Sequence, residues 1–178
     1  RRAASSSPAR RAGRDALYAQ SGLVLVEAFP SAPHLVVGGG GELAEVIGAQ
    51  ARLLGWEAEC VTGAAEAEEL LAARRDAACL VMLSHDPEFD VPAIRSALAL
   101  GVPYVGALGS RKTTARRREG LQAAGVREAE LARVHGPIGL DLGARTPAET
   151  ALAICAEILA VLAGRGVRPL RDTDGPLR

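Results

Sequence analysis

Short apolar runs of strand length alternate along this chain, from residue 23 onward, with amphipathic runs of helix length. This alternation is typical of a parallel sheet covered on both faces by helices, because parallel neighbours need a long crossover connection. Residues 34–38, 57–62, 77–83 and 102–106 are predicted to form the parallel strands, and residues 23–28 a preliminary strand at a sheet edge. The sequence therefore predicts an α/β fold with three layers and a mainly parallel sheet.

The ends of the predicted helices are marked by turn residues. Helices predicted over residues 42–54, 93–100 and 111–124 are each followed by a glycine, which adopts the left-handed backbone that closes a helix. The last helix opens with Thr146-Pro147-Ala148-Glu149, a capping box with proline at the first helical position. Between residues 151 and 162 it is apolar on almost every side, broken only by Glu157. It is therefore either a buried core helix or a face for a second copy or a partner.

Composition excludes several classes of protein. The 178 residues and the 48% hydrophobic content fit one domain. We place it at residues 21–165, between a flexible tail or fragment edge (1–20) and a C-terminal tail (166–178). The 21 basic and 21 acidic residues cancel, so no overall field attracts nucleic acid or an anionic membrane. No apolar run reaches the ~18 residues that a membrane span needs.

The cysteines favour a reducing compartment. Cys60, Cys79 and Cys155 lie far apart in the sequence, without the spacing of a zinc site or a disulfide framework. Each falls on a predicted strand or helix among apolar neighbours, which favours reduced residues in the core. We therefore expect a cytoplasmic protein without a bound metal ion.

A glycine-rich turn joins the first predicted strand to the first helix. Gly39, Gly41 and Ala44 fit the pattern G-x-G-x-x-A of a Rossmann-like fold, in which a phosphate approaches the backbone N–H groups at a helix N-terminus. We assign Gly39, Gly41 and Glu42 to cofactor binding; the alternative is a turn used only for tight packing. Thr62, which we also assign to cofactor binding, ends the second strand. An acidic residue would hold the ribose of NAD at this position, so ordinary NAD binding is disfavoured.

Polar residues follow the third predicted strand. Ser84, His85 and Asp86 come directly after it, at the edge of the sheet where open parallel sheets bind ligands. We assign all three to cofactor binding. The alternative for Asp86 is that it only caps a helix whose first residue is Pro87.

The turn after the fourth predicted strand carries the strongest local signal for phosphate. Gly106, Gly109, Ser110 and Arg111 combine a flexible backbone, a capping hydroxyl and a cation at a helix start, all of which favour an anion. Three further arginines follow at 116–118, but three consecutive helical residues cannot all face one ligand.

A long connection spans residues 134–147. It is too apolar for a surface loop that only joins two elements. Its glycines and proline indicate a fixed conformation that covers part of the molecule or a ligand. Asp141 in this connection is the last residue assigned to cofactor binding. The alternative is that Asp141 and Arg145 simply form an ion pair.

Taken together, these residues resemble one family. The chain resembles the C-terminal, Rossmann-like domain of XdhC/CoxI proteins, the accessory factors of xanthine dehydrogenase and related molybdenum hydroxylases. The resemblance runs from about residue 23 to 162, and it is carried by Val26-Glu27 with Pro30 and Pro33 and by residues 39–44, 84–87, 104–111 and 135–149.

This resemblance implies a non-catalytic chaperone that binds molybdenum cofactor, as molybdopterin or its dinucleotide form. The chaperone would protect the cofactor while its terminal sulfur ligand is installed, and pass it to an apo-hydroxylase such as xanthine dehydrogenase. A homodimer and a cysteine desulfurase partner are also implied. The sequence departs from the family in lacking its usual N-terminal domain with a cysteine-containing motif, in Thr62-Gly63 where an acidic residue often stands, and in Thr114 where histidine is frequent. These departures argue against independent sulfur handling.

Two other functions remain open. One is an NAD(P)-dependent oxidoreductase, in which His85 donates a proton and the arginines bind a 2′-phosphate; the absence of an acid at Thr62-Gly63 would suit NADP better than NAD. The other is an interaction module that docks a partner through its apolar last helix.

Overall fold

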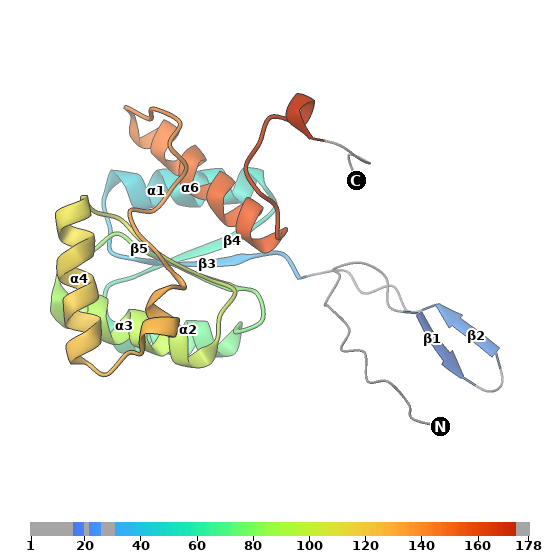
Figure 1. Cartoon of the computed structure of the whole chain (residues 1–178), viewed down its shortest axis with the longest axis horizontal. Coiled ribbons are helices and arrows are strands. Elements are labelled where there is room, and N and C mark those ends of the chain that lie inside the picture. The colour runs from blue at the N-terminus through green and yellow to red at the C-terminus, as the bar shows by residue number, and fades with distance from the viewer. Residues whose placement is uncertain (1–15, 20–21, 26–30, 174–178) are drawn as a thin grey trace, which may run out of the picture. The chain divides into compact units, whose positions relative to one another are not determined.

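The structure is a computed structural model that describes residues 16–19, 22–25 and 31–173 (Figure 1). The chain divides into two compact units, residues 1–30 and 31–178. In the first unit, strand β1 (Ala16–Ala19) pairs antiparallel with strand β2 (Gly22–Leu25).

Two predictions concern this part of the chain. Strand β1 lies within the segment 1–20 that we expected to be a tail, of which residues 1–15 and 20 are outside the described residues. Strand β2 covers part of the predicted edge strand 23–28, but among the described strands its only partner is β1. The physical reason is local: an antiparallel neighbour a few residues away satisfies the backbone hydrogen bonds of β2.

The second unit alternates strands and helices along most of its length. In chain order these are β3 (His34–Gly38), α1 (Glu42–Leu53), β4 (Glu57–Val61), α2 (Ala64–Ala73), β5 (Ala78–Met82), α3 (Pro87–Leu100), β6 (Tyr104–Ala107), α4 (Arg111–Ala123), α5 (Glu128–Leu131), β7 (Val134–His135), α6 (Pro147–Leu162) and the 3₁₀ turn η1 (Leu170–Asp172).

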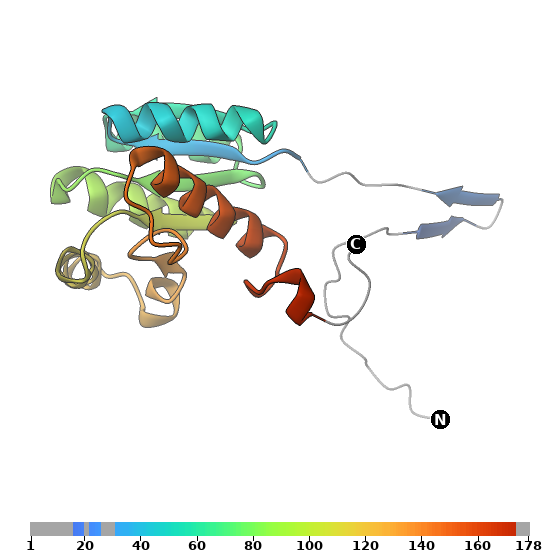
Figure 2. The same cartoon turned by 90° about the horizontal axis from the view of Figure 1, so that it is seen from above.

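Strands β3 to β7 form one parallel sheet in the order β4-β3-β5-β6-β7, which confirms the predicted α/β class. Helices α1 and α6 cover one face, and α2 and α3 cover the other (Figure 1). Helix α4, yellow in Figures 1 and 2, lies toward the end of the sheet where β3, β5 and β6 finish. The strand order reverses between β3 and β5, and this switch point is where open α/β sheets leave a crevice for ligands.

Two apolar cores explain the continuous apolar runs of the central strands. All five residues of β3 and all five of β5 are buried, because helices cover both faces. On the α1/α6 side, Leu35, Ile47 and Ile154 belong to one core; on the other side, Leu80 and Ile94 belong to the second.

Helix boundaries agree with the glycine signals at their C-termini. Gly55, Gly101 and Gly125 all have positive φ and follow α1, α3 and α4. The capping box at the start of α6 is present: the Thr146 hydroxyl accepts from the Glu149 N–H, and the Glu149 carboxylate accepts from the Thr146 N–H. In the part of the chain that the structure describes, no helix is both long and apolar enough to span a bilayer.

Three local predictions were wrong. Helix α3 begins at Pro87 rather than at residue 93, because Asp86 caps it and the helix continues through Pro92. The connection 134–147 starts with a strand, β7, that extends the sheet. Cys60 is exposed rather than buried, because β4 pairs with β3 only and lies at the sheet edge, whereas Cys79 and Cys155 are buried as predicted.

Candidate functional site

Three turns meet at the carboxyl end of the sheet. They follow β3 (residues 39–41), β5 (83–86) and β6 (108–110), and the strand order makes the first two neighbours and the last two neighbours. The backbone links them: Leu83 and Ser84 N–H groups donate to Gly38 O at 2.8 and 3.1 Å, and the Leu108 N–H donates to Met82 O at 2.7 Å. The topology therefore gathers most of the predicted site residues along one edge.

The first turn needs glycine at Gly39. This residue has φ +111°, and a Cβ added to it would lie 3.1 Å from the Ser84 backbone nitrogen. The turn after β3 thus approaches the turn after β5 closely. Gly40 lies beyond it in open space, with no atom within 4 Å of an added Cβ. This close packing does not exclude a ligand above the two turns.

Helix α1 begins at this turn with free donors. Its N-cap, Gly41, has φ +90° and supplies no capping side chain, and the first N–H to bond within the helix is that of Glu45, which donates to Gly41 O at 3.3 Å. The preceding N–H groups and the helix dipole are thus available to an anion. Glu42 is exposed in the first turn, where its carboxylate can accept from ligand hydroxyl or N–H groups.

In the other two turns, side chains accept hydrogen bonds from the first N–H groups of helices α3 and α4. Asp86 Oδ1 accepts from the Glu88 N–H at 3.0 Å and so caps α3, while Ser84 Oγ accepts from the Asp86 N–H at 3.0 Å. Ser110 Oγ caps α4 by accepting from the Thr113 N–H at 3.1 Å. Of these three helices, α1 alone starts without a side-chain cap. This contrast moves the emphasis for anion binding from Ser110 back to the turn at Gly39–Gly41.

Packing inside the fold explains why residue 106 is a glycine. It is buried within β6, and an added Cβ would lie 2.6 Å from Ile138 Cδ1 and 2.7 Å from the Tyr104 hydroxyl. The glycine therefore makes room for the connection between β7 and α6. Gly109, with φ +150°, lies in the turn itself and leaves room for the Thr113 side chain, which an added Cβ would approach to 2.9 Å. Arg111 is exposed at the start of α4.

A buried ion pair fixes the second and third turns. Arg117 Nε and Nη2 donate to Asp90 Oδ2 at 3.0 and 2.7 Å, with both side chains about 5% exposed. The same guanidinium donates to the carbonyls of Ser84 and Leu108, each at 3.1 Å. Arg117 thus connects α3, α4 and the ends of β5 and β6. Burial raises the pKa of Asp90, and the hydrogen bonds and charge of Arg117 oppose that rise.

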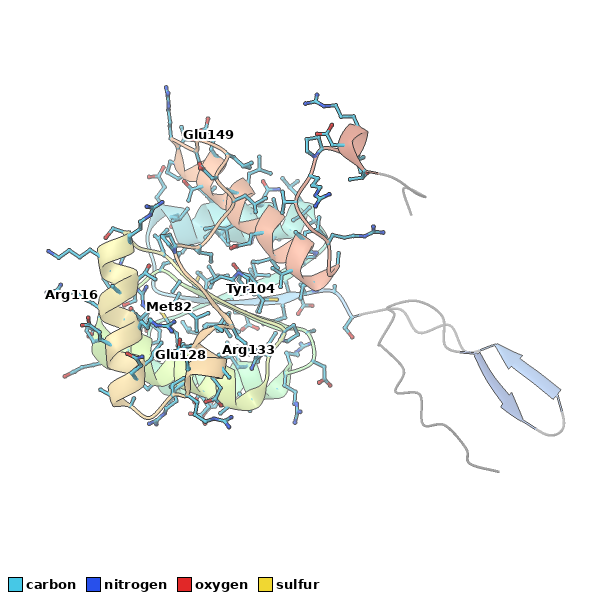
Figure 3. All side chains as sticks on the ribbon, viewed as in Figure 1. Met82, Tyr104, Arg116, Glu128, Arg133 and Glu149 are labelled. Carbon is cyan, nitrogen blue, oxygen red and sulfur yellow. The ribbon has the colours of Figure 1, made fainter. Side chains whose placement is uncertain are left out.

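A cavity of about 410 Å³ opens beside this ion pair, between α3 and α4. Its lining combines an apolar wall with polar groups: His85, Pro87, Asp90, Val91, Thr113, Arg116, Arg117 and Gly120. Its size falls in the usual range of small-molecule sites. Arg116, marked on α4 in Figure 3, is exposed, whereas the neighbouring Arg117 points inward. Both arginines therefore line the cavity, but Arg117 is held in the buried ion pair and Arg116 is exposed.

The remaining predicted residues lie apart from this cavity. Thr62 is exposed at the end of β4, and its N–H donates to the Glu66 carboxylate at 3.3 Å. The end of β4 thus does carry an acid, supplied by the first turn of α2, which corrects the expectation that no acid lies there to repel a 2′-phosphate. Asp141 is exposed, and within residues 31–173 it forms no ion pair with Arg145.

Glu157 organises the connection before α6. Its carboxylate accepts from the Tyr104 hydroxyl at 2.6 Å and the Gly139 N–H at 2.8 Å, and lies 3.3 Å from His135 Nδ1. Tyr104, labelled in Figure 3, also stacks on the His135 ring. Burial acts to raise the pKa of Glu157, but these hydrogen bonds hold it below its ordinary value. The charged residue that interrupts the apolar helix therefore fixes the loop that precedes it.

Sequence reasoning missed Asp90 and Arg117 as parts of the site. A signal was present for Arg117, because its spacing from Thr113 and Leu121 places it on one helix face with a buried residue. Asp90 gave no such signal, since the helix was predicted to begin only at residue 93 and no role was predicted for the residues just before it. Among the described residues no cluster of His, Cys, Asp and Glu suits a metal ion.

Comparison with known proteins identifies the family. The model of the XdhC Rossmann domain matches residues 35–158. The chain belongs to the XdhC family. Apart from His34, the first residue of β3, the parallel sheet lies within the matched region, as do the glycine turn and the cavity between α3 and α4, so they are features of this XdhC domain.

Relatives of the XdhC domain include two proteins of Escherichia coli (strain K12). YqeB is 28% identical over 85% of this chain and 32% of its own length. The molybdenum cofactor insertion chaperone PaoD is 30% identical over 46% of this chain and 26% of its own length. A solved structure of a xanthine dehydrogenase from Bacillus halodurans matches with a TM-score of 0.58 and 18% identity, over 76% of this chain and 44% of that one, which shows the fold. The chain spans about a third or less of the curated relatives it matches.

Proposed function

We propose that this XdhC domain binds molybdenum cofactor at the carboxyl end of its sheet and serves as an accessory chaperone for a molybdenum hydroxylase such as xanthine dehydrogenase. The observation that carries the proposal is the uncapped N-terminus of α1, presented by Gly39–Gly41 at the β3/β5 switch point. Such a terminus suits a phosphate. Membership of the XdhC family and the similarity to PaoD favour molybdenum cofactor as the phosphate-bearing ligand.

The proposal makes this domain a binding protein for the cofactor rather than a catalyst. In the described residues, the polar groups at the strand ends are mostly engaged in caps and in the Asp90–Arg117 pair, and they do not form a nucleophile and base in contact. The proposal therefore gives this chain the tasks of binding and releasing the cofactor. We also propose that a cysteine desulfurase supplies the sulfur and that the chain forms a homodimer. Both expectations come from the resemblance to the family.

The test is a binding titration of the purified chain with molybdenum cofactor, NADP and NAD. We expect cofactor binding that weakens with salt, because phosphate recognition is partly electrostatic. NADP is disfavoured by the Glu66 carboxylate at the end of β4. NADP or NAD that bound more tightly than molybdenum cofactor would instead support the oxidoreductase.

A matched pair of variants tests the turn itself. Gly40 has open space around it, so Gly40→Asp places a negative charge beside the α1 N-terminus without a steric clash, and Gly40→Asn places a neutral side chain of the same shape there. We expect the Asp variant to bind the cofactor at least about tenfold more weakly, as like charges near one site cost about 1.4 kcal/mol or more. The Asn variant should bind nearly as the wild type does. Equal affinities of the two variants would contradict the proposal.

A further inference from the structure

The cavity between α3 and α4 is separate from the α1 N-terminus, and its chemistry differs. The turn at Gly39–Gly41 offers only backbone donors at a helix start. The cavity offers a carboxylate, an imidazole, a hydroxyl and a guanidinium beside apolar side chains. Two neighbouring sites of different chemistry suit a ligand that has a phosphate at one end and a polar ring at the other.

Asp90 has an unused acceptor at this cavity. Its Oδ2 atom receives both hydrogen bonds from Arg117, while its Oδ1 atom is buried and, among the described residues, receives no hydrogen bond of good geometry. Hydrogen bonding from the Ser84 hydroxyl and the charge of His85 both act, after Arg117, to lower the pKa of this carboxyl, so Ser84 is the one nearby side chain that could donate to it. A buried acceptor without a donor is costly, so a ligand that brings an N–H group to it gains affinity.

The rest of the lining suits a flat ring. Pro87 and Val91 supply apolar contact, and Gly120 leaves the α4 wall without a side chain. The exposed guanidinium of Arg116 can stack on a planar heterocycle, and Thr113 can exchange hydrogen bonds with its edge. A cavity of about 410 Å³ has ample room for a bicyclic ring.

We infer that this cavity holds a 2-amino-4-oxopyrimidine ring, the polar edge of a pterin, with its N–H donors directed to Asp90 and its face against Arg116. This assignment rests on the proposed function, and it adds an orientation: the phosphate lies at the α1 N-terminus and the pterin lies between α3 and α4. Guanine carries the same edge, so the guanine base of a dinucleotide form is the second source of this chemistry.

The test uses the full chain with 6-hydroxymethylpterin, lumazine and guanosine as probes, followed by amide chemical shifts and by affinity. Lumazine has a carbonyl in place of the 2-amino group and therefore lacks one donor. We expect pterin to shift the amides of Thr113 and Gly120 and to bind about tenfold more tightly than lumazine. Guanosine binding tighter than pterin would assign the cavity to the nucleotide base and overturn the pterin orientation.

Two variants with matched controls locate the ring. Gly120→Leu fills the cavity from α4, where an added Cβ already lies 3.2 Å from Val91, while Ala115→Leu adds the same side chain on an exposed position of the same helix. Arg116→Gln removes the stacking cation, and Arg95→Gln on α3 is its control. Pterin and molybdenum cofactor should both bind about tenfold more weakly to the two cavity variants, and normally to the controls.

The outcomes separate this inference from the proposed function. If the wild type binds molybdenum cofactor and Gly120→Leu binds it equally well, or if pterin shifts amides elsewhere or none at all, the pterin assignment is wrong and the chaperone proposal stands. If the wild type binds no molybdenum cofactor, the proposed function itself is wrong. Asp90→Asn adds a third readout where it folds: the preference for pterin over lumazine should decrease.

Discussion

The Arg117→Met variant tests the ion pair that fixes two of the three turns. Arg117 makes four hydrogen bonds, two to Asp90 and one each to the Ser84 and Leu108 carbonyls. Methionine keeps much of the side-chain volume but leaves the Asp90 carboxylate buried without its partner. Breaking a buried pair in this way costs about 3–5 kcal/mol. We therefore expect the free energy of unfolding to decrease by about 4 kcal/mol.

The assay is urea unfolding followed by circular dichroism, with two comparison variants. Arg118→Met removes the neighbouring arginine, whose exposed pair with Glu128 should contribute less than about 1 kcal/mol. The double variant Asp90→Leu/Arg117→Met removes both charges, so it should recover at least about 2 kcal/mol of the loss. If Arg117→Met lies within about 1 kcal/mol of the wild type, the pair does not hold the turns as we describe.

The same variant has a predicted pH dependence. Burial raises the pKa of Asp90 in the folded state above its unfolded value, so the folded protein binds this proton more readily. Stability from this group is therefore greatest in acid and decreases as the pH rises from the unfolded pKa through the folded pKa. Loss of Arg117 removes the main opposing interaction and raises the folded pKa further. The difference between variant and wild type should thus be smaller in mild acid than at neutral pH.

Two further predictions concern the core and the thiols. Gly106→Ala should destabilise the fold by about 1–3 kcal/mol in urea unfolding, since its Cβ would lie 2.6 Å from Ile138, whereas Gly40→Ala should be nearly neutral; equal effects would contradict the packing at Gly106. An alkylating reagent should modify Cys60 in the native chain, because it is exposed, and spare Cys79 and Cys155, whose pKa values burial raises to about 12 and about 11; mass spectrometry that finds Cys60 unmodified would contradict its exposure.

The sheet could be predicted from the sequence because its determinants are local. After His34, which begins β3, the central strands are apolar, and glycines such as Gly101 mark the helix ends whatever the tertiary contacts. Strand order was beyond such reasoning, as was the pairing of β2 with β1, because register and partner depend on contacts that no local pattern encodes. Helix α3 begins at Pro87 rather than at residue 93, and it continues through Pro92 although a proline inside a helix removes one backbone hydrogen bond.

The sequence predicted which polar residues lie at the candidate site, but not which hydrogen bonds their side chains form. Ser84, Asp86 and Ser110 do follow parallel strands, yet their side chains accept hydrogen bonds from the backbone N–H groups of helix starts and turns. Which backbone N–H groups remain free to bind a ligand depends on the hydrogen bonds formed in the folded structure, and the sequence alone does not reveal them. The partners of Arg117 and Glu157 could not be predicted from the sequence, because they lie 27 residues and 53 residues away in the chain, at Asp90 and Tyr104.

The most direct test of cofactor binding at the strand ends is a crystal structure of the chain with molybdenum cofactor. We predict density for a phosphate within hydrogen-bond distance of the N–H groups that follow Gly41, and density for the pterin between α3 and α4 beside Asp90. Density for the cofactor on another surface, or a chain that crystallises without it at saturating concentration, would contradict the account.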